Sequence, residues 1–142
     1  MAATTEIRVR GYHLDVYGHV NNARYLEFLE EARWDLLEKI IDLKAWQSRG
    51  LSFFVVNITI NYRRPATMGH VLEIRTRLDR FGNKSATLAQ DVYLKQDDTL
   101  VADAKITFVI ADSRTGRAVP LEGELREMFE PFCELKDCLS KR

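Results

Sequence analysis

The segment that spans residues 11–33, GYHLDVYGHVNNARYLEFLEEAR, concentrates residue types that carry out acid–base and acyl-transfer chemistry. Within it, Asp15 stands between a strand-like stretch and the start of a helical pattern. A carboxylate there could act as a base or a nucleophile, while backbone N–H groups at the helix start hold a developing oxyanion. A lone Asp at this place also suits a turn or a helix cap, so both interpretations remain open.

The residues that follow Asp15 also have a structural and a functional interpretation. Asn21 and Asn22 are both good N-cap residues, but only one can cap the helix. The other could present its side-chain amide or its backbone N–H to a ligand carbonyl. Gly18 serves either a turn or the close approach of a substrate to the backbone. His19 is either a general base or a hydrogen-bonded structural group.

Other common catalytic and cofactor-binding patterns do not occur in the sequence. The three histidines, His13, His19 and His70, do not have metal-ligand spacing. The chain has no G-x-S-x-G nucleophile motif, no P-loop and no G-x-G-x-x-G motif. We therefore expect neither a metal nor an organic cofactor.

Basic residues gather in the stretches NYRRPA and DRFGNKS, at or near the ends of expected strands. They are either solvated edge charges or a phosphate clamp for a nucleotide-like handle such as coenzyme A. The whole chain has 21 basic and 21 acidic residues, so bulk charge does not indicate a nucleic-acid partner. The basic residues in question are Arg63, Arg64, Arg80 and Lys84.

The clearest element of the pattern is a long helix from Asn22 to about Ile40. Its apolar residues share one broad face, so other elements are expected to wrap round it. Arg33 falls inside this apolar arc, where an unpaired charge is costly, so we expect Glu30 or a carboxylate of another element to pair with it. Trp34 points off the arc and is a candidate for a subunit contact. The apolar face comprises Tyr25, Phe28, Leu29, Ala32, Leu36 and Ile40.

The remaining pattern predicts a sheet. A short strand is expected in EIRVRGY, before the long helix, and a short second helix at about residues 42–49. Four strands with short connections follow, and a short helix at about residues 124–130 closes the pattern. Short hairpins, one of them at FGNK, imply an antiparallel sheet, so the predicted class is α+β. In the first of the four strands, one face is expected to carry Phe54, Val56, Ile58, Ile60 and Tyr62.

Length and composition set the broad class of the protein. The length of 142 residues suits one domain, residues 1–142, and 46% hydrophobic residues predict a compact fold. The N-terminal stretch lacks the apolar core of a signal peptide, and no apolar run reaches membrane-spanning length. Two cysteines, Cys133 and Cys138, do not make a disulfide framework or a zinc set, so we expect reduced thiols. These features predict a cytoplasmic protein without a membrane partner.

Taken together, these stretches resemble a known family. The chain is similar to the hotdog-fold acyl-CoA thioesterases of the 4-hydroxybenzoyl-CoA thioesterase type, and among them to the bacterial long-chain acyl-CoA thioesterase III branch. The stretch VRGYHLDVYGHVNNARYLEFLEEARWD carries most of the resemblance, and VVNITINYRRPA, VADAKITFVIAD and LEGELRE extend it over nearly the whole chain. The resemblance implies a hotdog fold, in which an antiparallel sheet wraps round a long central helix.

The resemblance also implies roles for particular residues. The D-x-x-G loop of the family matches residues 15–18, which makes Asp15 the expected catalytic carboxylate. The residue seven positions later, Asn22, is expected to polarise the thioester carbonyl through its backbone N–H. Several relatives have His or Tyr at this position, so no acid–base role is implied for the Asn22 side chain. The residues expected to contact the substrate are Tyr17, Gly18, His19, Arg63, Arg64 and Lys84.

An activity and an assembly follow from the same resemblance. GHVNN is similar to the loop of fatty acyl-carrier-protein thioesterases, so the expected reaction is hydrolysis of medium- to long-chain fatty acyl-CoA. The family builds its active site at a dimer interface, so a homodimer or a dimer of dimers is expected. The alternative is a hotdog protein that binds acyl thioesters without hydrolysing them. Enoyl-CoA hydration is not expected, because hydratases of this fold use a D-x-N-P-x-H loop and Asp15 is followed by VYGH.

Overall fold

The computed structural model describes residues 2–134 and 138, so the ends of the predicted domain, residues 1–142, lie outside it. The long helix begins and ends where the pattern predicts, and the strands follow in the predicted order. The elements are β1 (Ala3–Arg8), η1 (Gly11–His13), α1 (Asn22–Ile40), α2 (Leu43–Ser48), β2 (Leu51–Tyr62), β3 (Val71–Phe81), β4 (Ala86–Leu94), β5 (Leu100–Asp112), β6 (Arg117–Ala118), α3 (Glu124–Phe129) and η2 (Glu130–Phe132).

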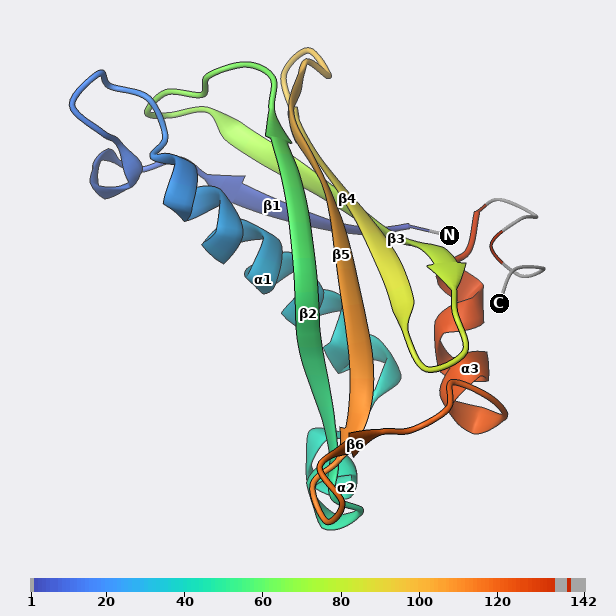
Figure 1. Cartoon of the computed structure of the whole chain (residues 1–142). Helices are drawn as coiled ribbons and strands as arrows, with labels where there is room; N and C mark the ends of the chain where they lie inside the picture. The colour runs from blue at the N-terminus through green and yellow to red at the C-terminus, as the bar shows by residue number, and fades with distance from the viewer. Residues whose placement is uncertain (1, 135–137, 139–142) are drawn as a thin grey trace.

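The strands form one antiparallel sheet in the order β1-β3-β4-β5-β2, with the short β6 paired to β5. Helix α1 runs along one face of this curled sheet, and α2 lies at its far end beside β2 (Figure 1). The α+β prediction is therefore confirmed. None of the helices in residues 2–134 is long and apolar enough to cross a membrane.

Polar contacts and an apolar face hold α1 against the sheet. Thr5 of β1 donates to Asp35 at 2.6 Å. Gln90 of β4 is fully buried and donates to the carbonyl of Leu29 at 3.0 Å, beneath the middle of the helix. Burial of an apolar helix face supplies most of the stability of such a helix, and the paired amide avoids the cost of an unsatisfied polar group. The buried face of α1 comprises Tyr25, Phe28, Leu29, Ala32, Arg33, Leu36 and Leu37.

A β-bulge in β2 changes the predicted pattern of that strand. Its pairing with β5 shifts between Val55 and Asn57, so Val56 is the extra residue. Phe53 therefore stacks on the buried Phe108, with ring centroids 4.4 Å apart, whereas Phe54 and Val56 are 54% and 58% exposed. The predicted inward face is wrong before the bulge. After the bulge it is confirmed, because Ile58 and Ile60 pack against the core.

The predicted carboxylate partner of Arg33 is also wrong. Arg33 donates to the amide oxygen of Gln90 at 3.1 Å, because Gln90 lies under the same face of α1. Glu30 occupies the exposed flank of the helix, where its carboxylate accepts from the indole N–H of Trp34 at 3.4 Å. Burial lowers the pKa of Arg33, and the charge of Glu30 partly offsets that effect.

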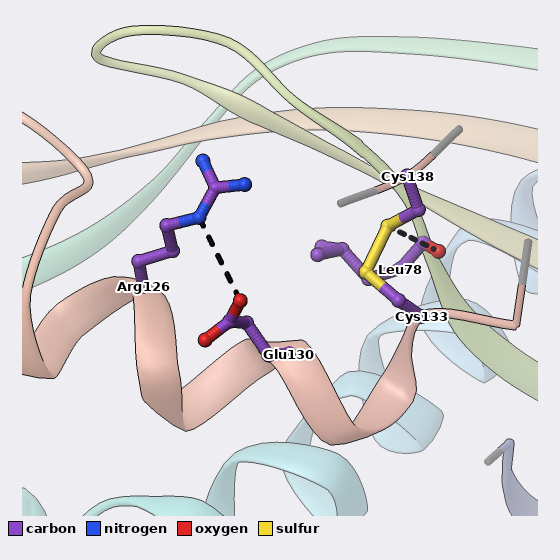
Figure 2. The surroundings of a disulfide bond; sticks show 5 residues. All are labelled: Leu78, Arg126, Glu130, Cys133 and Cys138. Carbon is purple, nitrogen blue, oxygen red and sulfur yellow. Dashed lines mark hydrogen bonds and ion pairs between the residues drawn. A yellow bond between two sulfur atoms is a disulfide. The ribbon is translucent and has the colours of Figure 1, made fainter. Parts of the chain in front are cut away.

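The two cysteines correct another expectation. Cys133 and Cys138 form a disulfide beside β3, instead of remaining reduced thiols (Figure 2). The sequence argument used the number of cysteines, whereas pairing depends on their separation in space, and their Cα atoms lie 5.8 Å apart, within the reach of a disulfide. Cys133 also forms a parallel bridge with Leu78 of β3, so the disulfide lies against the sheet.

The FGNK hairpin is confirmed between β3 and β4, but it does not use the positive φ angles that glycine and asparagine adopt readily in such turns. None of residues 82–85 has a positive φ. The turn is instead closed by a hydrogen bond from the N–H of Gly82 to the carbonyl of Ser85 at 2.6 Å.

Candidate active site

The loop around Asp15 is a turn in which one carboxylate oxygen is fixed and the other is not. Asp15 Oδ1 accepts from the N–H groups of Tyr17 and His19 at 2.9 and 3.2 Å. The N–H of Asp15 donates in return to the carbonyl of His19 at 2.8 Å, and Gly18 has φ +77°, a conformation that glycine adopts without strain. Within the described chain, Oδ2 has no hydrogen-bond partner. The turn therefore orients the carboxylate and leaves one oxygen for chemistry.

The start of α1 settles which asparagine is the cap. Asn21 has extended backbone angles, and its side chain accepts from the N–H of Ala23 at 2.9 Å, so Asn21 is the N-cap. Asn22 is the first helical residue. No acceptor among residues 2–134 and 138 pairs with its N–H, as is usual for the first turn of a helix. This N–H carries the positive end of the helix dipole, which favours a partial negative charge on a ligand.

Asp15 and Asn22 line the same cavity, which has a volume of about 230 Å³. The loop is tied to the segment that follows β2 through a hydrogen bond from Val20 N–H to the carbonyl of Ala66 at 2.9 Å. The hydroxyl of Tyr62, at the end of β2, donates to the carbonyl of Asn22 at 3.1 Å. The cavity is lined by Asp15, His19, Val20, Asn22, Tyr25, Tyr62, Arg63, Arg64 and Pro65.

Two tyrosines in this cavity were not among the predicted site residues. Tyr25 and Tyr62 pack ring edge to ring face, with centroids 5.6 Å apart. Burial raises the pKa of Tyr25 to about 12, so its phenol remains protonated and uncharged at neutral pH. In the sequence, both residues belong to apolar patterns and read as core positions. The position of Tyr62 directly before Arg63 was the only available signal of a place at the site.

The predicted basic residues separate into two groups. Arg63 and Arg64 line the Asp15 cavity. The Arg63 guanidinium pairs with Asp103 at 2.6 Å and lowers the pKa of that carboxyl, whereas Arg64 forms no ion pair in the described part of the chain. Lys84 lies in the β3–β4 hairpin, which is at the other end of the sheet. The pairing with β5 shows this separation. Asn61, near Arg63, pairs with residue 103, whereas Ala86, near Lys84, pairs with residue 108, about 17 Å further along the strand.

The other predicted contacts lie on the same loop as Asp15. His19 lines the cavity and is exposed, whereas Tyr17 is 80% exposed and does not line it. The structure thus brings together Asp15, Asn22, His19, Arg63 and Arg64, with Gly18 supplying the turn, and it places Lys84 elsewhere. In the described residues, no three or more His, Cys, Asp or Glu side chains form a group that could hold a metal ion.

The chain is similar in sequence to known thioesterases. The chain is 55% identical over 126 residues to the long-chain acyl-CoA thioesterase FadM of Escherichia coli (strain K12), covering 89% of this chain and 96% of the relative. It is 28% identical over 107 residues to the acyl-CoA thioester hydrolase YbgC of Escherichia coli O157:H7, covering 75% and 79%.

Solved structures show the same fold. The probable thioesterase YbaW from Escherichia coli superposes with a TM-score of 0.85 at 52% identity, covering 93% of this chain and 99% of the other. A dynemicin thioesterase superposes with a TM-score of 0.84 at 19% identity, which shows the fold alone. The model of the Thioesterase-like superfamily matches residues 9–129, and the chain therefore belongs to that superfamily.

Proposed function

We propose that this protein is an acyl-CoA thioesterase that hydrolyses medium- to long-chain fatty acyl-CoA to a fatty acid and coenzyme A. The observation that carries the proposal is that Asp15 and Asn22 meet at one place, with the Oδ2 of one and the N–H of the other left open. Both residues line the same cavity, and neither Asp15 Oδ2 nor the Asn22 N–H has a hydrogen-bond partner in the described chain. The 55% identity to an enzyme named long-chain acyl-CoA thioesterase supports the reaction and the acyl class.

In the proposed mechanism, the thioester carbonyl accepts a hydrogen bond from the Asn22 N–H at the start of α1. The charge that develops on this oxygen is then stabilised by the N–H and the helix dipole. Asp15 either takes a proton from the attacking water or attacks the carbonyl carbon itself, in which case water hydrolyses the resulting anhydride. In both routes the C–S bond breaks and the departing thiolate is protonated. Tyr62 anchors the Asn22 carbonyl and so holds the N–H donor in place.

A thiol-release assay tests the proposed activity. Purified protein is supplied with acyl-CoA esters from short to long acyl chains, and free coenzyme A is measured with a thiol reagent. We expect turnover that rises toward the medium- and long-chain esters. Binding of these esters without thiol release would instead show a non-hydrolytic acyl-thioester-binding protein.

Arg64 is the proposed ligand of the coenzyme A phosphates, because it lines the cavity and has no carboxylate partner among the described residues. The Arg64→Ala variant is expected to raise KM for acyl-CoA about tenfold while kcat stays near that of the wild type, since charge-assisted contacts to a phosphate act on binding. Steady-state kinetics at low and moderate salt measure this effect. Lys84→Ala, at the far end of the sheet, is the matched control and should change neither parameter.

Edge strand β2 is the proposed dimer interface. It carries Phe54 and Val56, which are 54% and 58% exposed, and such a long apolar edge is typical of a surface that a second chain covers. Val56→Asp should shift the protein from dimer to monomer in light scattering, because pairing would bury the new charge. Thr4→Asp places the same charge on the opposite edge strand, β1, and should leave the mass unchanged. A monomeric wild type would contradict the proposal.

A further inference from the structure

A second cavity lies between the C-terminal half of α1, helix α2 and the first half of β2. Its volume is about 340 Å³, within the range of small-molecule sites, and it shares no lining residue with the Asp15 cavity. Leu37, Ile41, Leu43 and Phe53 form apolar walls. The two tryptophans of the chain, Trp34 and Trp46, also line it. These walls suit an alkyl chain.

One wall of this cavity carries a buried cation. Arg33 is 7% exposed and lines the cavity. One of its guanidinium nitrogens donates to Gln90, and no other described residue accepts from the remaining nitrogens. These remaining Arg33 nitrogens are not fully buried. Among the described residues, Trp46 Nε1 is the one side-chain nitrogen or oxygen that is fully buried without a hydrogen-bond partner, and no Arg33 nitrogen shares that state. The guanidinium therefore has donors left for a group inside the cavity.

The carboxylate of Glu30 does not complete the Arg33 site. Glu30 lines the rim of the cavity and acts on Arg33 by charge, but no ion pair joins them. Its carboxylate is bonded to the Trp34 indole. A buried charge with a neutral amide as its hydrogen-bond partner is costly, and a carboxylate that enters the cavity would relieve this cost through two parallel N–H···O bonds.

We propose that this cavity is a second binding site, for a long-chain carboxylic acid whose carboxylate pairs with Arg33 and whose alkyl chain contacts the apolar walls. Within one chain the site is distinct from the Asp15 cavity, because Arg33 lies eleven residues beyond Asn22, about 16 Å along the helix. A fatty acid is also the product of the proposed reaction. The link between this ligand and the reaction product rests on the proposed function, but the binding of a carboxylic acid to this cavity does not.

The two tryptophans give a direct readout, because both line this cavity. Intrinsic fluorescence is titrated with dodecanoate and, as an uncharged control of equal length, dodecanol. We expect a saturable change with dodecanoate and a Kd about tenfold lower than that for dodecanol, since only the acid can pair with Arg33. Arg33→Met should weaken dodecanoate binding about tenfold and leave dodecanol binding nearly unchanged. Glu30→Gln should tighten dodecanoate binding, because it removes a like charge from the rim.

The same titration in Asp15→Asn separates this site from the catalytic one. Because the inference does not need turnover, dodecanoate should bind this variant as it binds the wild type. Equal affinities for acid and alcohol, with no effect of Arg33→Met, would overturn the carboxylate site. Weaker binding in Asp15→Asn, with Arg33→Met unaffected, would place the acid in the catalytic cavity and overturn the second site as well. If the wild-type protein releases no thiol from acyl-CoA, the proposed function is wrong, but the inference of a second binding site is unaffected.

Discussion

The Asp15→Asn variant is expected to lose about 10²–10⁴-fold in kcat for acyl-CoA hydrolysis, the usual contribution of a positioned acid–base group. The substitution keeps the shape of the side chain. The amide oxygen can still accept from the N–H groups of Tyr17 and His19, so the turn should survive. An NH₂ group then replaces Oδ2, and this group neither attacks a carbonyl nor takes a proton from water. Thiol release measures the loss, and a thermal melt checks the fold.

Asp42→Asn is the matched control for Asp15→Asn. Asp42 caps α2, and its Oδ1 accepts from the N–H groups of Lys44 and Ala45 at 3.0 and 3.3 Å, the same kind of contact that Asp15 makes in its turn. The control variant removes a carboxylate that has the same structural role as Asp15 but lies outside the Asp15 cavity. Its kcat should match that of the wild type. If Asp15→Asn also retains near-wild-type turnover, Asp15 is a turn residue and the proposed chemistry is wrong.

The parts of the fold that sequence predicted well depend on local pattern. The limits of α1 follow from a good cap, Asn21, and from apolar residues at helical spacing, and both properties are set by neighbours in the chain. The alternation of apolar residues at the start of β3 is a local property of the same kind, and Leu72, Ile74 and Leu78 are buried.

The errors arise where distant residues decide the outcome. The bulge at Val56 depends on how β2 pairs with β5, and an unbroken alternation in the sequence does not reveal it. Arg33 finds Gln90, 57 residues away, and this pairing depends on how α1 lies over β4. The disulfide between Cys133 and Cys138 likewise depends on how these two residues lie in space, with Cys133 bridged to Leu78 of β3.

The predictions for the site also divide into local features and contacts between distant residues. The turn interpretation of Asp15 is confirmed by the contacts of Oδ1, whereas its catalytic role stays a prediction that the unpartnered Oδ2 of the described structure allows. The resemblance pointed to Asn22, and the structure gives the local reason, since Asn21 is the cap and Asn22 presents the first helical N–H. The contact of Tyr62 with Asn22 could not be predicted, because it joins the end of β2 to the start of α1.

The role proposed for the Asn22 backbone leads to a second prediction of large effect. Asn22→Pro is expected to lower kcat about 10²–10³-fold, the usual cost of removing one oxyanion donor, because proline has no N–H. Asn22 is the first helical residue, a position where proline is common, and Asn21 already has φ −62° and ψ 137°, which suit a residue before proline. The carbonyl of residue 22 remains, so the hydrogen bond from Tyr62 can persist. Helix and fold should therefore survive the loss of the N–H.

Asn22→Ala separates the backbone from the side chain at this position. Alanine keeps the N–H and removes the amide, so this variant should retain most of the wild-type kcat in the thiol-release assay. The cap should be unaffected in both variants, because it is made by the side chain of Asn21. A fully active Asn22→Pro would mean that the carbonyl oxygen is held by another donor. Equal losses in Asn22→Pro and Asn22→Ala would move the role from the N–H to the side-chain amide. Only a large loss in the proline variant with a small loss in the alanine variant identifies the start of α1 as the oxyanion site.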